Sequence, residues 1–195
     1  AFAVTTACLA APMLYSGAVL LETASGTVTH PEAKAQNRAA VRAAIKRPQF
    51  WLIALAFPLM AMNHGMLLNH IMPLLAERDI AKTTAVLIAS TIGPAQVAGR
   101  VLLVAVQTRV STLTVAVIAF SGVVIAALLL IAAGVAPWLS FAFAVFQGAA
   151  YGLTSIIKPA ITADFLGRTG FGAIAGWLAL PYLAGFAFAP HIGSL

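Results

Sequence analysis

The sequence predicts an all-α membrane protein, and two observations carry this prediction. Hydrophobic residues make up 62% of the 195-residue chain and charged residues only 8%, whereas a soluble domain typically carries about a quarter charged residues. The apolar residues are also gathered into long runs. This composition excludes an ordinary soluble enzyme and a disordered chain. It also excludes a nucleic-acid-binding protein, because the few charged residues that give the net charge of +6 cannot form a basic groove.

Six runs have about the 20 residues that a helix needs to cross roughly 30 Å of hydrocarbon. Arg100 is the only charged residue within them. Backbone hydrogen bonds in lipid must be satisfied within the chain, so each run is expected to be a helix. No alternation of polar and apolar residues indicates a membrane β-barrel. The predicted six-helix bundle comprises residues 1–21, 50–76, 83–107, 111–133, 137–157 and 171–191.

The first connection, residues 22–49, is the longest and the most basic. Four of its basic residues recur at every fourth position, which places them on one face of a helix. They are Lys34, Arg38, Arg42 and Lys46. We predict a short helix that lies on the anionic lipid of the inner leaflet, the alternative being a solvated linker.

The distribution of basic residues predicts the orientation of the spans. Nine of the 11 lysines and arginines lie in or beside the first, third and fifth connections. Because basic loops stay on the cytoplasmic side, these connections are expected to be cytoplasmic. The chain begins with Ala1 without a basic leader and stops soon after the last run, so we expect it to be part of a longer protein.

Two segments resemble a known family. Residues 93–100 read GPAQVAGR and residues 164–172 read DFLGRTGFG; they resemble span eight and the turn between spans ten and eleven of the major facilitator superfamily. That family has twelve spans in two halves joined by a long cytoplasmic loop. The resemblance implies a partial major facilitator fold: residues 1–21 as span six, 22–49 as the central loop, and 50–195 as the C-terminal bundle without its last helix.

The resemblance also implies a set of gating or structural residues. Arg100 shares a helical face with Gln96, and we expect it to bond backbone carbonyls or a facing helix. The cytoplasmic loop motif of the family usually carries an Asp-Arg pair, but Thr108 precedes Arg109 here, so the acidic partner is missing. The full set is Gly93, Gln96, Gly99, Arg100, Arg109, Asp164 and Arg168.

The fifth run carries a polar stripe. Gln147, Tyr151, Thr154 and Lys158 are spaced four, three and four residues apart, which is one helical face. Polar groups in hydrocarbon are costly and usually face a cavity, so we interpret this stripe as the lining of a substrate cavity. The alternative is hydrogen bonding between helices, with Lys158 reaching back to the inner interface.

The second run contributes further polar residues to the candidate cavity. They are Asn63, His64 and Asn69. His64 lies in mid-span and is a candidate proton relay, the alternative being a histidine hydrogen-bonded to a neighbouring helix. Two prolines and Gly65 are expected to bend or interrupt this helix, and Pro181 is expected to kink the sixth run.

Small residues predict where helices approach closely. Residues 148–152 and 172–176 each begin and end with glycine, and this spacing is typical of tightly packed membrane helices.

The favoured function is a secondary active transporter that moves a small solute by alternating access and is coupled to protons. Its expected partners are the solute, protons, membrane lipid and the N-terminal half of the same transporter. The expected location is the bacterial inner membrane. A phosphate loop, HExxH and GxSxG are all missing, so no enzyme activity, cofactor or metal is expected. The alternative is a non-transporting protein, either an assembly subunit or an intramembrane enzyme.

Overall fold

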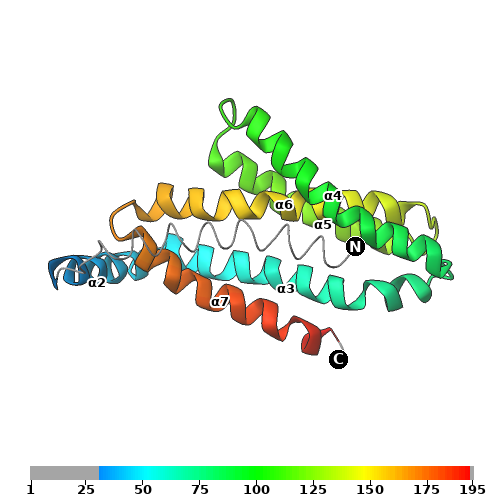
Figure 1. Cartoon of the computed structure of the whole chain (residues 1–195), viewed down its shortest axis with the longest axis horizontal. Helices are drawn as coiled ribbons and strands as arrows, with labels where there is room; N and C mark the ends of the chain where they lie inside the picture. Colours follow the sequence, from blue (N-terminus) through cyan, green and yellow to red (C-terminus); the bar gives the residue numbers. More distant parts are fainter. Residues whose placement is uncertain (1–30, 194–195) are drawn as a thin grey trace, which may run out of the picture. The chain divides into compact units, whose positions relative to one another are not determined.

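The computed structural model describes residues 31–193, and all of the regular structure in them is helical. The predicted span over residues 1–21 lies outside the described residues. Figure 1 shows the helices along the chain, which are α2 (Pro31–Ile45), α3 (Pro48–Ala76), α4 (Lys82–Val106), α5 (Thr112–Ala132), α6 (Leu139–Leu166) and α7 (Phe171–Ile192).

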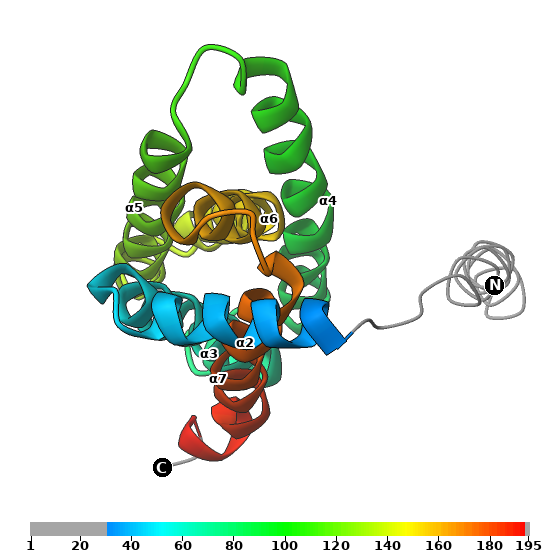
Figure 2. The ribbon, with the colours of Figure 1, turned by 90° about the vertical axis from the view of Figure 1, so that its left-hand side faces the viewer.

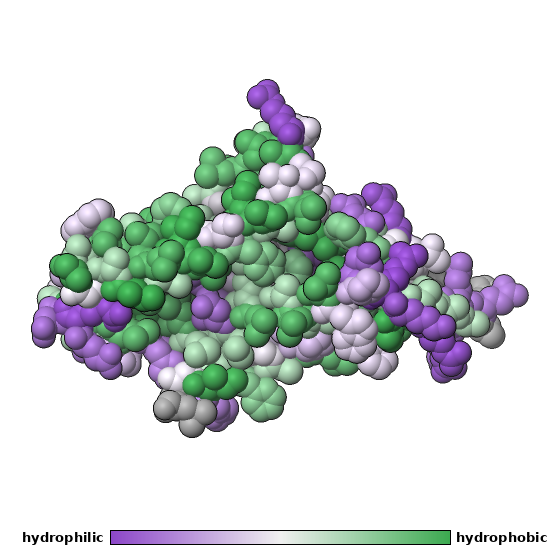
Figure 3. Space-filling view, turned by 180° about the vertical axis from the view of Figure 1, so that it is seen from behind, coloured by the Kyte–Doolittle hydropathy of each residue, from purple (hydrophilic) through white to green (hydrophobic). Residues whose placement is uncertain are grey.

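Five of these helices, α3 to α7, are long and apolar enough to cross a membrane. Large apolar side chains remain exposed along them, such as Leu128 on α5 at 60% and Leu180 on α7 at 60%. Figure 3 shows hydrophobic surface over much of one face, with the larger hydrophilic groups toward its two ends and on the projection at the top. The described part of the chain is therefore an all-α bundle of a multi-pass membrane protein, which confirms the coarse fold class predicted from composition.

The structure differs from the prediction at the end of one span and leaves another span continuous. Helix α6 continues nine residues beyond the end of the uncharged run at residue 157, through Pro159 to Leu166. Its extra turns bury Ile161 and Leu166 in an apolar cluster, and this packing outweighs the backbone hydrogen bond that a proline removes. Helix α3 is not interrupted at Pro58 or Pro73, because membrane helices tolerate proline where neighbouring helices pack against them; the expected bend stays a prediction.

The long helices pack as two groups. Helix α6 lies between α4 and α5, and α3 pairs with α7 (Figures 1 and 2). Contacts between the two groups, from α3 to α4 and α6 and from α6 to α7, are much sparser. All five helices belong to one compact unit, Ala39–Leu195.

Glycines allow the backbones to approach within each group. A Cβ on Gly148 would lie 2.7 Å from the Cβ of Ala95, and a Cβ on Gly152 would collide with the carbonyl oxygen of Gln96. The predicted close packing at residues 148–152 is therefore confirmed. At Gly172 and Gly176 a Cβ would meet nothing within 4 Å, so the close packing predicted for that second pair was wrong within the described part of the chain.

Helix α2 confirms that the first connection contains a helix. Val41 and Ala44 are buried in its second half, and Arg42 between them is exposed. The predicted contact with anionic lipid stays a prediction.

Candidate functional site

Two clusters of buried apolar side chains occupy different levels of the bundle. The first apolar cluster includes Phe57 and Met60 of α3. The second apolar cluster includes Leu67 and Ile71, farther along the same helix. Helix α6 shows the same separation in reverse order, since Phe143 belongs to the second cluster, whereas Ile157 and Ile161 belong to the first.

Polar side chains fill the level between these clusters. On α3 the apolar pattern is broken at Asn63 and His64, close to the middle of the helix. We call this set the polar layer; it consists of Asn63, His64, Gln96, Gln147, Tyr151 and Tyr182. Helices α3, α4, α6 and α7 contribute side chains to it.

The contacts in the layer run between the two helix groups. The side-chain amide of Gln147 on α6 donates to Oδ1 of Asn63 on α3 at 3.0 Å. The His64 ring stacks on the Tyr151 ring, with centroids 3.6 Å apart and planes 13° from parallel. Nε2 of Gln96 on α4 lies 3.5 Å from Nε2 of His64. Sparse packing between the groups is thus supplemented by polar contacts.

The layer extends to α7 through two tyrosines. The hydroxyls of Tyr151 and Tyr182 are 2.9 Å apart, a hydrogen bond in which either can donate. Nζ of Lys158 lies 3.8 Å from the centroid of the Tyr182 ring, within the range of a cation–π contact.

Burial differs sharply among the members of the layer. His64 is 4% exposed and Gln147 is 2% exposed. Nδ1 of His64 is buried without a hydrogen-bond partner among the described residues. Asn63, by contrast, is exposed. It lines a hollow of about 710 Å³ between α3 and α5, a size within the usual range for small-molecule sites.

The structure brings most of the predicted cavity residues together, but gives two of them local partners. The Asn69 side chain donates to the carbonyl of Gly65 at 2.8 Å, and the Thr154 hydroxyl donates to the carbonyl of Tyr151 at 2.7 Å. Both bonds lie within one helix, so these two residues do not connect the helix groups. Amide and hydroxyl side chains often bond to the preceding turn in this way.

The predicted gating or structural residues are spread over the helix ends and the α4–α6 contact. Nε of Arg100 donates to the carbonyl of Gly152 on α6 at 3.2 Å, which is the kind of backbone contact expected for it. A Cβ on Gly99 would lie 2.9 Å from the Cα of Ala149, whereas one on Gly93 would meet nothing within 4 Å. The side chains of Arg109, Asp164 and Arg168 are exposed. Their gating roles stay predictions.

Sequence reasoning missed Tyr182 as a member of the site. It is the one hydroxyl-bearing residue within the apolar run 171–191, and that isolation was the available signal. Gln96 was predicted as a gating residue, and the structure places it against His64.

The donor atoms of the polar layer are amides, an imidazole and phenols. No group of three metal-ligating histidine, cysteine, aspartate or glutamate side chains occurs among residues 31–193. These groups can hold a solute by hydrogen bonds and aromatic faces.

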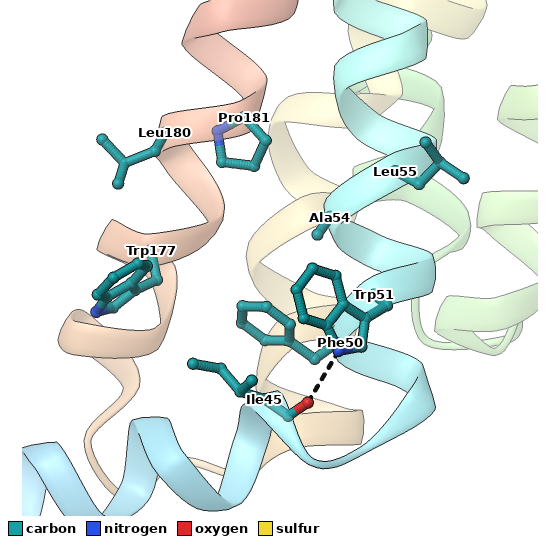
Figure 4. A pocket seen from close by; sticks show the side chains of 8 residues that line it. All are labelled: Ile45, Phe50, Trp51, Ala54, Leu55, Trp177, Leu180 and Pro181. Atoms are coloured by element: carbon teal, nitrogen blue, oxygen red, sulfur yellow. Dashed lines mark hydrogen bonds between the residues drawn. The ribbon is translucent and has the colours of Figure 1, made fainter.

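A second hollow, of about 520 Å³, lies between α3 and α7 and is lined mainly by apolar side chains. Figure 4 shows Trp51 and Trp177 along it, with Nε1 of Trp51 donating to the carbonyl of Ile45 at 2.9 Å. No set of polar side chains converges there, so it is a weaker candidate than the polar layer.

A comparison of the chain with models of known protein families, with curated proteins and with solved structures found no match. Function is therefore inferred from the polar layer and from the helix packing.

Proposed function

We propose that the chain belongs to a secondary active transporter of the major facilitator type, which moves a small solute across the bacterial inner membrane by alternating access. The single observation that carries this proposal is the polar layer in the middle of the long helices. Polar groups at mid-membrane depth are costly and are retained mainly where they serve a pathway. Transporters bind their substrates near the midplane, between helix groups.

The helix pairing gives a second line of support. Helix α3 pairs with α7, and α6 pairs with α4. This pattern is expected if α3–α4–α5 form one repeat and α6–α7 are the first two helices of a second repeat. Helix α6 is then equivalent to α3, and α7 is equivalent to α4. Short connections make successive helices antiparallel, so equivalent helices would cross the membrane in opposite directions. Inverted repeats of three helices are found within each half of major facilitator transporters.

In this proposal the chain supplies one wall of the substrate route. The two apolar clusters exclude water above and below the layer, while the exposed Asn63 and the half-buried Tyr151 face the route. The N-terminal half of the same transporter supplies the opposite wall.

Proton coupling is assigned to His64. Imidazole is the side chain whose charge changes most readily near neutral pH, and its buried Nδ1 is free of a hydrogen-bond partner among the described residues. A proton taken up there would alter the contacts to Gln96 and Tyr151.

The test is an exchange assay on membrane vesicles containing the full-length protein that includes this chain. Vesicles are preloaded with one unlabelled solute from a panel of small carboxylates, sugars and drug-like cations, and uptake of the labelled solute is measured. A transporter that works by alternating access takes up labelled solute faster when the vesicle interior already holds the same solute in unlabelled form. Net uptake, but not exchange, should fall when an uncoupler collapses the proton gradient.

Vesicles without the protein and the variant Leu128→Ala provide the controls. The variant should exchange solute like the unmodified protein, because Leu128 is 60% exposed on α5. If no solute of the panel is exchanged, the chain belongs to the non-transporting class and the proposal fails.

A further inference from the structure

The ammonium of Lys158 on α6 contacts an aromatic ring on the neighbouring helix α7. The backbone of Lys158 is eight residues, or about 12 Å, from the end of α6 at Leu166. Its ammonium lies over the ring of Tyr182, eleven residues or about 16 Å beyond the start of α7. The two helices are joined by the short connection 167–170, so both lengths start from the same end. The ammonium is therefore held against α7 within the bundle, about two turns of helix from the end of α6.

No neighbouring carboxylate balances this charge within the long helices. The single acidic residue in α3 to α7 is Asp164, which is six residues from Lys158 and therefore on a different side of α6. The ring of Tyr182 covers one side of the ammonium, but an ammonium has three N–H donors. None of them donates to another residue in the described part of the chain. Because Lys158 is only half-buried, a solute can reach it.

A hydroxyl donor lies close to the charge. In the Tyr151–Tyr182 pair one hydroxyl donates to the other, so the accepting hydroxyl keeps its own hydrogen for a further partner. A cation and a hydroxyl donor, flanked by two aromatic rings, match a carboxylate attached to a small organic body.

We propose that the solute is a small monocarboxylate whose carboxylate binds to Lys158 beside the two tyrosine hydroxyls. The inference rests on the proposed transport function and narrows its substrate class. One cation directed into the layer neutralises one negative charge, which favours a monoanion over a dianion. Sugars and organic cations lack the group that Lys158 recognises.

The experiment measures equilibrium binding of radiolabelled lactate and benzoate to the purified full-length protein in detergent, with lactamide and benzamide as neutral competitors of the same shape. We expect the acids to bind and the amides to compete at least tenfold more weakly, because a hydrogen bond to a charged partner is much stronger than a neutral one. Lys158→Gln should weaken acid binding by roughly ten- to a hundredfold. Lys158→Arg should retain most of it, because the charge is kept.

Lys82→Gln is the matched control, since Lys82 is an exposed lysine at the start of α4; it should bind the acids like the unmodified protein. Amides that compete as well as the acids, or a folded Lys158→Gln variant that binds acids normally, would overturn the inference. If that variant does not fold, the acid–amide comparison on the unmodified protein still decides.

The exchange assay separates the two proposals. Exchange of a sugar or a cation without any acid binding would support the transport function and overturn the proposal of a carboxylate substrate. Acid binding without exchange of any solute would support a carboxylate site at Lys158 and contradict the transport function.

Discussion

The α4–α6 contact and the polar layer join helices in opposite ways. At the α4–α6 contact, Gly99, Gly148 and Gly152 bring the two backbones together with no room for a methyl group. In the polar layer, longer side chains such as Gln147 and Tyr151 span the distance from α6 to α3 and α7.

The difference separates the contact that stabilises a helix pair from the contact to which the proposed function is assigned. Close backbone contact depends on shape, and a membrane helix pair gains most of its association from such packing. A hydrogen bond between membrane helices contributes on average only about 0.6 kcal/mol. The polar layer therefore costs free energy within the membrane and contributes little to helix association. This combination is expected of groups that are retained to bind a solute.

Substitution of Gly152 by Ala should give the largest loss of stability. Its added methyl group would collide with the backbone of Gln96, and overpacking of this kind costs typically about 1–3 kcal/mol. We expect the apparent melting temperature in detergent to fall by roughly 2–12 °C, as measured by scanning fluorimetry.

Gly176→Ala is the matched control for this prediction. Nothing lies within 4 Å of its added methyl group, and alanine is the better helix former. A melting temperature that falls equally in both variants would show that α4 and α6 do not depend on close backbone contact.

Substitution of Gln147 by Leu should have a smaller effect on stability and a large effect on transport. It removes the hydrogen bond to Asn63, so the free energy of unfolding should change by about 1 kcal/mol or less. Solute exchange in vesicles should fall at least tenfold. Normal exchange by this variant would show that the polar layer is structural packing.

The smallest effect is expected at the pair of tyrosine hydroxyls. Tyr151→Phe and Tyr182→Phe each remove the same hydrogen bond, so the double variant should be hardly less stable than either single one. A double-mutant cycle on the free energy of unfolding should give a coupling of about 0.6 kcal/mol. Additive losses would mean that the two hydroxyls act independently.

The helices could be predicted from the sequence more completely than the site. Long apolar runs in lipid leave few options besides helices, and four of the five described spans ended within two residues of their predicted ends. The end of α6 was missed because Lys158 and Pro159 interrupt its apolar run, whereas packing at Ile161 extends it.

The partners within the site depended on packing that periodicity does not contain. The spacing of Gln147 and Tyr151 predicted one polar face, but not that Tyr182 of α7 would meet it. The same spacing included Thr154, whose hydroxyl bonds to its own helix. Likewise, the glycine spacing at residues 148–152 and 172–176 is identical, but within residues 31–193 only the first pair has another helix in close contact with its glycines.

The most direct test of the account is whether water reaches the polar layer. A cysteine at Asn63 and a control cysteine at Leu128, which is exposed on α5, are introduced into the full-length protein after Cys8 is replaced by serine. Each is treated with a membrane-impermeant maleimide, which reacts with thiolates in contact with water. The account predicts that the cysteine at position 63 is labelled and that the cysteine at position 128 is not. A folded protein in which position 63 remains unlabelled from both sides of the membrane would contradict it.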